Sequence, residues 1–142
     1  MENGNRYLKM ENRKKKPIRT FQDLEVYQNL YKAMVTVLKE IITNLPKEEK
    51  FDLVDQMRRS CKAGPAILAE GFAKRYQKKA WSKYIDDTIG ECYEMINHLS
   101  VCIDVYSKYV DPKLCNEVIN LYIISCKQLT NLKKSWKNYH DR

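Results

Sequence analysis

Three carboxylates have a spacing that could serve metal binding. Asp87, Glu91 and Glu94 recur at i, i+4 and i+7, so they would share one face of a helix. Such a face can hold a metal ion inside a helix bundle, but these sites also use Glu-x-x-His motifs on the facing helices. The sequence contains no Glu-x-x-His motif. We therefore expect this stripe to bind no metal.

Two adjacent arginines offer the carboxylates another use. Arg58 and Arg59 need acidic partners wherever their guanidinium groups are buried. Glu70 and the carboxylate stripe are the natural partners, either within one subunit or between subunits. A solvated polar face is an equally good interpretation of the stripe.

Histidine, glycine and cysteine do not form an enzyme motif. The isolated His98 is expected to be a packing residue, and the four glycines form neither a dinucleotide-binding loop nor a Walker loop. The cysteines are odd in number and at least ten residues apart, which fits neither a disulfide framework nor a zinc site. We predict a protein that is not an enzyme and has no cofactor, with buried thiols in a reducing cytosol. The five cysteines are Cys61, Cys92, Cys102, Cys115 and Cys126.

Positive charge is concentrated in the first segment of the chain. The net charge is +8, and residues 1–19 hold seven Lys or Arg against two Glu. A segment that is basic and poor in aliphatic side chains cannot bury enough surface to order itself, so we predict a disordered arm over 1–19. Such arms are attracted to phosphate backbones, although a role in solubility alone is an alternative.

Two further basic groups lie near aromatic side chains. The first falls within 74–83, near Tyr76, Trp81 and Tyr84, and the second accompanies Trp136. Phosphate contacts combined with aromatic platforms for unpaired bases are typical of RNA sites. Lysines close to a helix C-terminus also suit the helix dipole, which is an alternative reason for the second group. The residues predicted to bind nucleic acid are Arg13, Lys14, Lys15, Lys16, Arg19, Lys74, Arg75, Lys78, Lys79, Lys83, Lys133, Lys134 and Lys137.

The elements that position these groups are predicted to be helices. Proline and glycine are scarce, and apolar residues recur at spacings of three and four. Thr20 with Asp23 forms a capping-box pattern, Pro46 stops the first run, and Asp111 with Pro112 forms a helix start. The sequence thus predicts an all-α four-helix bundle over 20–142, with helices near 21–45, 52–75, 80–109 and 112–138.

The length and composition fit one domain. A chain of 142 residues with 44% hydrophobic residues can build one core without metal or disulfide bonds. Short links between the helices favour antiparallel neighbours in an up-down-up-down bundle, which would bring the three basic groups to one end. No apolar run is long enough to span a membrane, and a cytoplasmic location is expected.

The first helix carries an apolar seam with alternating steps of three and four. The seam comprises Leu24, Tyr27, Tyr31, Met34, Leu38, Ile41 and Leu45. A second apolar stripe lies beside the seams of the first and third helices, and so wide an apolar face predicts a second contact, most simply another subunit. The alternative is one longer seam that is buried within a single subunit. The residues assigned to the subunit interface are Leu30, Val37, Arg58, Arg59, Ile89, Ile96 and Ile103.

Three segments resemble one protein family. They are FQDLEVYQ at residues 21–28, LPKEE at 45–49 and FDLVDQMRRSCKAGPAILAEGFAKRY at 51–76. The last segment resembles the second helix of the bacterial four-helix bundle proteins of the S23 type, whose genes often lie inside 23S rRNA intervening sequences. The same family includes the accessory variability determinant proteins of diversity-generating retroelements. Typical members carry Pro-Ser-Asn before Ile-Ala-Glu-Gly, whereas this chain has the apolar Ala66 and Ile67 after Pro65.

The resemblance implies a ring-shaped homopentamer and a reverse transcriptase as partner. Together with the basic groups, it favours a non-enzymatic RNA-binding accessory protein that holds template RNA and enzyme together. A protein-interaction scaffold of the S23 type without a nucleic-acid role is the alternative. A thiol or metal enzyme would require exposed, reactive cysteines.

Overall fold

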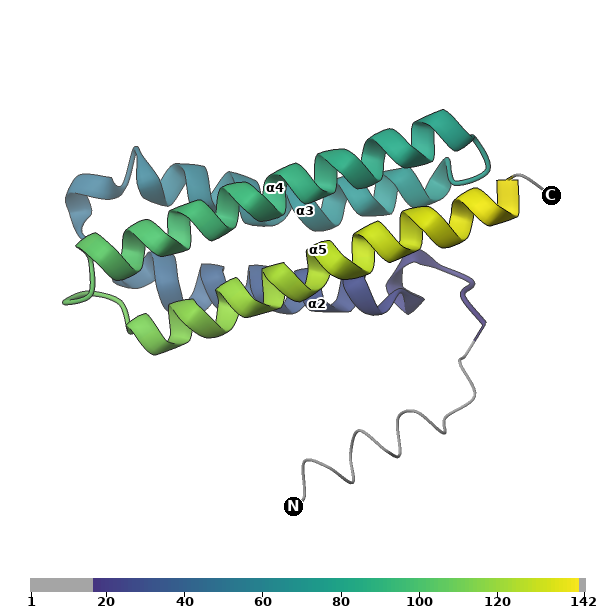
Figure 1. Cartoon of the computed structure of the whole chain (residues 1–142). Helices are drawn as coiled ribbons and strands as arrows, with labels where there is room; N and C mark the ends of the chain where they lie inside the picture. The colour runs from purple at the N-terminus through teal and green to yellow at the C-terminus, as the bar shows by residue number, and fades with distance from the viewer. Residues whose placement is uncertain (1–16, 141–142) are drawn as a thin grey trace, which may run out of the picture.

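The structure is a computed structural model that describes the backbone of residues 17–140 and the side chains of residues 17–136. This part of the chain is helical and contains no strand, which confirms an all-α helical bundle. Four long helices pack side by side (Figure 1). They are α2 (Glu25–Thr36), α3 (Leu53–Ala73), α4 (Lys78–Val105) and α5 (Pro112–His140).

The first predicted helix is interrupted rather than continuous over 21–45. The chain passes through the 3-10 turn η1 (Phe21–Asp23) before α2 begins. The Asp23 carboxylate accepts hydrogen bonds from the amides of Arg19 and Thr20, each at 2.9 Å, which confirms the reciprocal half of the predicted capping box. Beyond α2 the chain continues as η2 (Val37–Ile41), a π-helical turn, and the 3-10 turns η3 (Ile42–Asn44) and η4 (Lys47–Glu49).

The face of α2 that lies in the core is one residue out of register with the predicted seam. Leu30 and Val37 are 0% exposed, whereas Tyr31 is 49% exposed. Both registers have apolar residues at three-and-four spacing, but the tyrosines carry hydroxyl groups that are costly to bury without partners. The prediction that Leu30 and Val37 form an outer stripe is therefore wrong.

The start of α5 follows the sequence prediction, and the end of α4 does not. Asp111 Oδ1 accepts a hydrogen bond from the Lys113 amide at 3.0 Å, and α5 begins at Pro112 as expected. Helix α4 ends at Val105, four residues before the predicted boundary, and Val110 is buried in the link that follows. The Tyr106 hydroxyl donates a hydrogen bond to Glu49, which ties this link to the turn before α3.

The helices pack α3 against α4, α4 against α5, and α2 against both α3 and α5. At one end of the α4–α5 pair the rings of Trp81 and Trp136 meet edge to face, with centroids 5.7 Å apart. At the other end of α4, Cys102 Sγ lies 3.8 Å from Met57 Sδ, near the start of α3. Large apolar side chains fill the space between the helices, including Met57, Leu68, Ile85, Met95, Leu99 and Leu129.

Helix α3 approaches α4 closely at Gly71. A Cβ atom at Gly71 would lie 2.5 Å from Tyr84 Cβ and 3.0 Å from Tyr84 Cγ. Beside this contact the Tyr84 hydroxyl donates to Glu70 Oε1 at 3.0 Å. The absence of a side chain at position 71 thus sets how near the two helices can lie, and the neighbouring hydrogen bond holds them there.

Candidate nucleic-acid interface

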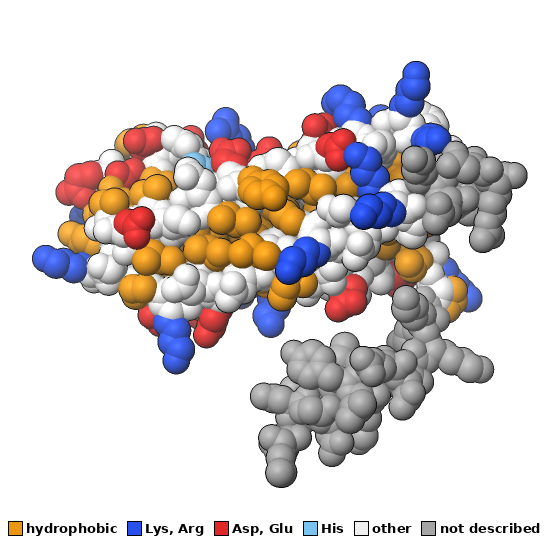
Figure 2. Space-filling view, in the orientation of Figure 1, with side chains coloured by type: hydrophobic (Ala, Val, Ile, Leu, Met, Phe, Trp, Pro, Cys, Tyr) orange, Lys and Arg blue, Asp and Glu red, His pale blue; other side chains and the backbone are white. Residues whose placement is uncertain are grey.

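One end of the bundle gathers the predicted basic groups that lie within the described residues. The α3–α4 link, the last turns of α5 and the start of the described chain lie at this end (Figure 1). Lys and Arg side chains are prominent there on the face drawn in Figure 2, whereas an apolar band runs along the middle of that face. We call this the basic end. Of the remaining predicted contacts, Arg13, Lys14, Lys15, Lys16 and the side chain of Lys137 lie outside the described residues.

Arg75 is held by two aromatic rings at the α3–α4 link. Its guanidinium carbon lies 4.1 Å from the Phe72 ring centroid and 4.4 Å from that of Tyr76. It donates hydrogen bonds of 2.9 Å to the Phe72 carbonyl and the Tyr76 hydroxyl. These contacts fix the side chain, so Arg75 orients Tyr76, which is 62% exposed and presents an aromatic surface to solvent.

Lys74 is committed to a small network beside this link. Its Nζ donates to the Tyr84 hydroxyl at 2.9 Å and lies 3.8 Å from Glu70 Oε1. The hydrogen bond to Tyr84 raises the pKa of the Lys74 ammonium. Within the subunit, Glu70 thus pairs with Tyr84 and Lys74 rather than with the arginines for which the sequence suggested it.

The first turns of α4 form a shallow, charged depression of about 640 Å³. Lys83 Nζ lies 3.2 Å from Asp87 Oδ2, and Lys133 of α5 donates to both carboxylate oxygens of Asp86 at 2.9 and 3.0 Å. Exposed pairs of this kind are weak, at about 0.2–1 kcal/mol, so a phosphate can compete for the same ammonium groups. The depression is lined by Lys78, Lys79, Ser82, Lys83, Asp86 and Asp87.

Other predicted basic contacts are exposed at the basic end. Lys78, Lys79 and Lys134 are exposed on the first turn of α4 and the last turns of α5, and Arg19 is exposed before η1. Within the described part of the chain, Lys79 and Lys134 have no carboxylate partner. These side chains can contact an anion without breaking an existing ion pair.

Trp81 cannot serve as a platform for a base. It is 1% exposed and packs between Phe72 and Trp136, so the pairing of Trp81 with the basic cluster was misleading. Tyr84 is half-buried and held by the network with Lys74. Of the three aromatic residues proposed for the link, Tyr76 is the exposed one.

The residues assigned to a subunit interface lie in three different settings. Leu30 and Val37 are inside the subunit's own core. The isoleucines at 89, 96 and 103 are half-buried against the subunit's own core. Arg58 and Arg59 are exposed on α3.

The pKa values of Glu91 and Glu94 shift in opposite directions, although Ser60 and the Arg59 charge act to lower both. Burial and the adjacent charge of Glu94 raise the pKa of the Glu91 carboxyl. Burial also opposes ionisation of Glu94, but the proximity of Ser60, His98 and the Arg59 charge lowers its pKa overall. His98 is buried with Nε2 3.3 Å from Glu94 Oε1, as expected of a packing residue with a polar partner. The stripe is therefore in part the electrostatic partner of Arg59.

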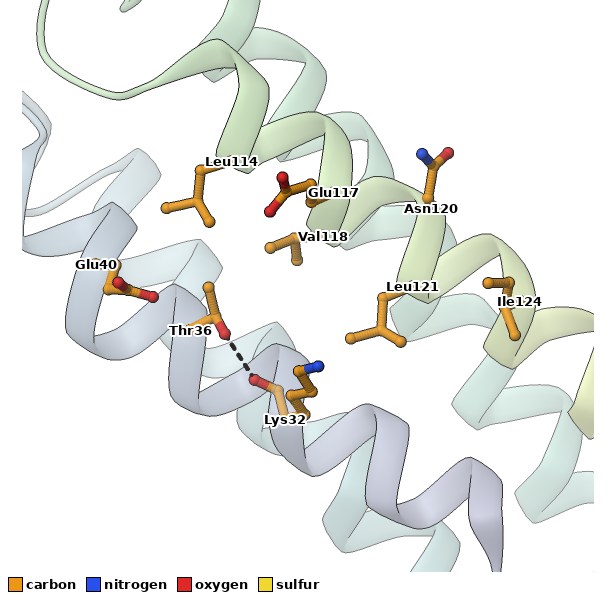
Figure 3. Close-up of a pocket in the computed structure, with 9 residues that line it drawn as sticks. All are labelled: Lys32, Thr36, Glu40, Leu114, Glu117, Val118, Asn120, Leu121 and Ile124. Atoms are coloured by element: carbon orange, nitrogen blue, oxygen red, sulfur yellow. Dashed lines mark hydrogen bonds between the residues drawn. The ribbon is translucent and has the colours of Figure 1, made fainter. Parts of the chain in front are cut away.

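The sequence interpretation missed a groove between α2 and α5, with a volume of about 370 Å³. Figure 3 shows Leu114, Val118 and Leu121 directed toward α2, with Lys32 and Glu40 on the opposite wall. Thr36 Oγ1 donates to the Lys32 carbonyl at 3.0 Å, so its hydroxyl is satisfied locally. The spacing of Leu114 and Leu121 by seven residues was the available signal.

The structure gives no metal site or membrane span in the region it describes. No three His, Cys, Asp or Glu side chains converge in a metal-binding arrangement among residues 17–136. No helix in the described chain combines the length and apolar character needed to cross a bilayer. All five cysteines are free thiols, four of them buried and Cys126 partly exposed.

The motifs that carry the family resemblance are structural in this fold. Phe21 packs edge to face on Tyr27 with centroids 4.8 Å apart, and Gln28 Nε2 donates to the Gln22 carbonyl at 2.9 Å. In the second motif the Glu49 carboxylate accepts from the Leu53 amide at 3.1 Å, at the start of α3. These residues shape turns and helix contacts.

The chain was compared with models of known protein families. The chain matches the family described as 23S rRNA-intervening sequence protein over residues 22–131, which spans α2, α3 and α4 and most of α5. No significant match was found among curated proteins or among solved structures. Because the match covers well over half of the sequence, the chain belongs to the 23S rRNA-intervening sequence protein family.

Proposed function

We propose that this protein is a non-enzymatic RNA-binding accessory protein of the cytoplasm. The observation that carries the proposal is the basic end, where Lys78, Lys79 and Lys134 are exposed and the Tyr76 ring, at the same end, faces solvent. Ammonium groups bind phosphate oxygens, and an exposed aromatic ring offers a stacking surface to an unpaired base.

The opposite end of the bundle carries a mixture of acidic and basic side chains. Exposed carboxylates, among them Asp52, Asp104 and Asp111, are interspersed there with lysines such as Lys108 and Lys113. A mixed surface of this kind repels phosphate more than the basic end does, so RNA should engage one end of the molecule.

The most concrete form of the proposal is a partner of a reverse transcriptase that binds template RNA in a diversity-generating retroelement. Its support is the resemblance to accessory variability determinant proteins together with the basic end. In this form up-down-up-down bundles assemble into a ring-shaped homo-oligomer, a pentamer by the same resemblance. Repetition of the basic end in each subunit would raise the affinity for one RNA through multivalency.

The proposal is tested by measuring RNA affinity across a range of salt concentrations. The double variant Lys78→Glu, Lys79→Glu removes two exposed ammonium groups near the first turn of α4, where acidic residues suit the helix dipole. Binding of a structured RNA should weaken, and the slope of log K against log salt should become shallower by about 0.7–0.9 for each phosphate that the protein no longer neutralises.

The matched control is Lys108→Glu, Lys113→Glu, which makes the same change of charge at the opposite end. This control should retain most of the affinity and the steeper salt slope. If the two double variants lose RNA affinity equally, the loss reflects the change in net charge and not a binding site at the basic end. If the unmodified protein does not bind the RNA with micromolar or tighter affinity at low salt, the RNA-binding proposal is wrong.

A protein-interaction scaffold is the second candidate, and the α2–α5 groove is the observation that favours it. Ile124, 48% exposed, lies on α5 at this groove, and Ile123, 40% exposed, is not among the residues that line it. If the groove seats a second copy of the chain, Ile124→Asp should lower the mass measured by light scattering, whereas Ile123→Asp should not. The reverse result would assign self-association to the surface around Ile123. If neither variant changes the mass, neither surface is a self-association interface.

A further inference from the structure

Four of the five cysteines face one another in two pairs across α4 and α5. The Asp86–Lys133 ion pair and the Trp81–Trp136 contact join the start of α4 to the end of α5, so the two helices run in opposite directions. Each step forward on α4 is then matched by a similar step back on α5. Cys92 lies six residues after Asp86, and Cys126 lies seven before Lys133.

The second pair follows from the same register. Ten residues beyond Cys92 is Cys102, and eleven residues before Cys126 is Cys115. The electrostatics of the thiols agree with this register, because Cys126 is the neighbour that acts most strongly on the pKa of Cys92, and Cys115 is the one that acts most strongly on the pKa of Cys102.

The two pairs differ in their access to solvent. Cys102 and Cys115 are both 0% exposed, and Cys102 also contacts Met57 in the core. Cys92 is likewise buried, but its partner Cys126 is partly exposed and lines a surface depression of about 420 Å³. This depression is also lined by Tyr93, Lys127, Thr130 and Asn131. One member of the Cys92–Cys126 pair can therefore be reached from outside, and the other lies directly behind it.

The reachable thiol is also the more acidic of the two. The interaction with Cys92 lowers the pKa of the Cys126 thiol, while the interaction with Cys126, together with burial, raises the pKa of Cys92 above its ordinary value. A thiolate reacts with oxidants and a thiol does not, so reaction should begin at Cys126.

We propose that Cys126 and Cys92 form an oxidisable dithiol whose oxidant is a small peroxide. The Cys126 sulfur attacks one peroxide oxygen, the O–O bond breaks, and hydrogen peroxide yields a sulfenic acid and one water. The Cys92 sulfur then attacks the Cys126 sulfur, an S–S bond forms, the S–O bond breaks, and a second water leaves. Together the two thiols lose two electrons and two protons, which the peroxide accepts.

The product is a covalent link between the middle parts of α4 and α5. The disulfide protects the Cys126 thiol from further oxidation. It also links α4 and α5, whose first turns and last turns, respectively, lie at the basic end. The Cys102–Cys115 pair has the same register but no exposed member, so it is a built-in control for access.

The test oxidises the reduced, full-length protein with hydrogen peroxide and maps the products by alkylation and peptide mass spectrometry. A linked pair of peptides containing Cys92 and Cys126 should appear, with a mass lower by two hydrogen atoms. Cys126 should lose its free thiol at least about tenfold faster than Cys102 and Cys115, because buried thiols are inert. Similar rates for all the cysteines, or dimers linked through Cys126 alone, would overturn the proposal.

Two variants separate the steps. Cys92→Ala removes the resolving thiol, so the sulfenic acid at Cys126 should accumulate and be trapped by dimedone. Cys115→Ala removes a member of the buried pair and should leave the Cys92–Cys126 link unchanged. Failure of the Cys92→Ala protein to accumulate the dimedone adduct would also overturn the proposal, with circular dichroism used to establish that the variant is folded.

Discussion

At the scale of single residues, the family motifs act through contact geometry. Gly71 and Glu70 belong to the Ala-Glu-Gly motif, and in the structure they set and hold the crossing of α3 over α4. Asp23 and Glu49 belong to the other two motifs, and each accepts backbone hydrogen bonds at a turn. The resemblance therefore follows residues that build the bundle, and the exposed basic residues require their own tests.

Replacement of Gly71 by alanine should destabilise the protein by about 1–3 kcal/mol, since overpacked contacts cost this much. The new Cβ would lie 2.5 Å from Tyr84 Cβ, which cannot move without moving α4. Gly90 is the matched control, because nothing lies within 4 Å of a Cβ placed there. Gly90→Ala should stabilise the helix by about 0.5–1 kcal/mol. Urea unfolding compares the two, and equal effects would contradict the close approach.

The Tyr106–Glu49 hydrogen bond predicts a stability difference that depends on pH. This bond, followed by the bond from the Leu53 amide, lowers the pKa of the Glu49 carboxyl, and it raises the pKa of the Tyr106 phenol to about 12. A carboxyl whose pKa is lowered by folding stabilises the fold at pH values above its ordinary pKa. This stabilisation is lost as the pH falls through the pKa of the folded state. A phenol whose pKa is raised by folding stabilises the fold below pH 10, and this stabilisation is lost as the pH rises through about 12.

Tyr106→Phe should therefore lower Tm most at intermediate pH, with the difference shrinking in acid and in strong alkali. Thermal unfolding followed by circular dichroism at several pH values measures this. Tyr109→Phe is the control, since Tyr109 is an exposed tyrosine three residues further along the same link. A constant Tm difference across the pH range would show that the hydrogen bond does not stabilise the fold.

At the scale of elements, the first helix shows how two apolar patterns compete. One pattern passes through Leu30 and Val37, and the other passes through Tyr27 and Tyr31. The core selected the aliphatic pattern, and the tyrosines lie near the surface with their rings 6.0 Å apart. The π-helical turn η2 then alters the helical phase, so that Ile41 and Ile42 are both buried.

The two patterns predict opposite orders of stability for neighbouring substitutions. Leu30→Ala should cost about 2–5 kcal/mol because it leaves a cavity in the core. Tyr31→Ala should cost less than about 1 kcal/mol, because the side chain is half in solvent. Denaturant unfolding of the two variants decides between them. A greater loss in Tyr31→Ala would restore the seam inferred from the sequence.

At the scale of the whole molecule, the basic groups from distant parts of the sequence share one end. The α3–α4 link, the end of α5 and the start of the described chain lie there because α3, α4 and α5 are long helices joined by short links (Figure 1). Several of the ammonium groups at this end are already paired with Asp86, Asp87 or Glu70. The net attraction for phosphate is therefore smaller than a count of lysines suggests.

Removal of residues 1–19 should reduce the salt dependence of RNA binding without abolishing it. The segment holds seven Lys or Arg against two Glu, and each neutralised phosphate adds about 0.7–0.9 to the slope. The measurement compares the full chain with a chain that starts at Thr20, on one structured RNA from about 50 to 300 mM salt. An unchanged salt slope would mean that the segment does not contact RNA. Complete loss of RNA binding in the shorter chain would mean that the basic end of the bundle does not bind RNA.

The sequence by itself determined that the chain forms long helices and where α5 begins. Alternating spacings of three and four specify a helix locally, and a cap such as Asp111 acts on an amide two residues away. Such signals depend on neighbours within one or two turns, so they could be identified without knowledge of the fold. The basic groups and the odd set of free cysteines were equally visible, since they depend on composition alone.

Tertiary structure decided which face of α2 is buried, which lysines are paired and which cysteines meet. Trp81 became a core residue because Phe72 and Trp136 enclose it, and no local pattern specifies that enclosure. Lys133 reaches Asp86, and Cys126 reaches Cys92, across a register that is set by packing over the whole length of two helices. Spacing along one helix fixes a direction around its axis, whereas the partner found in that direction depends on where the other helices lie.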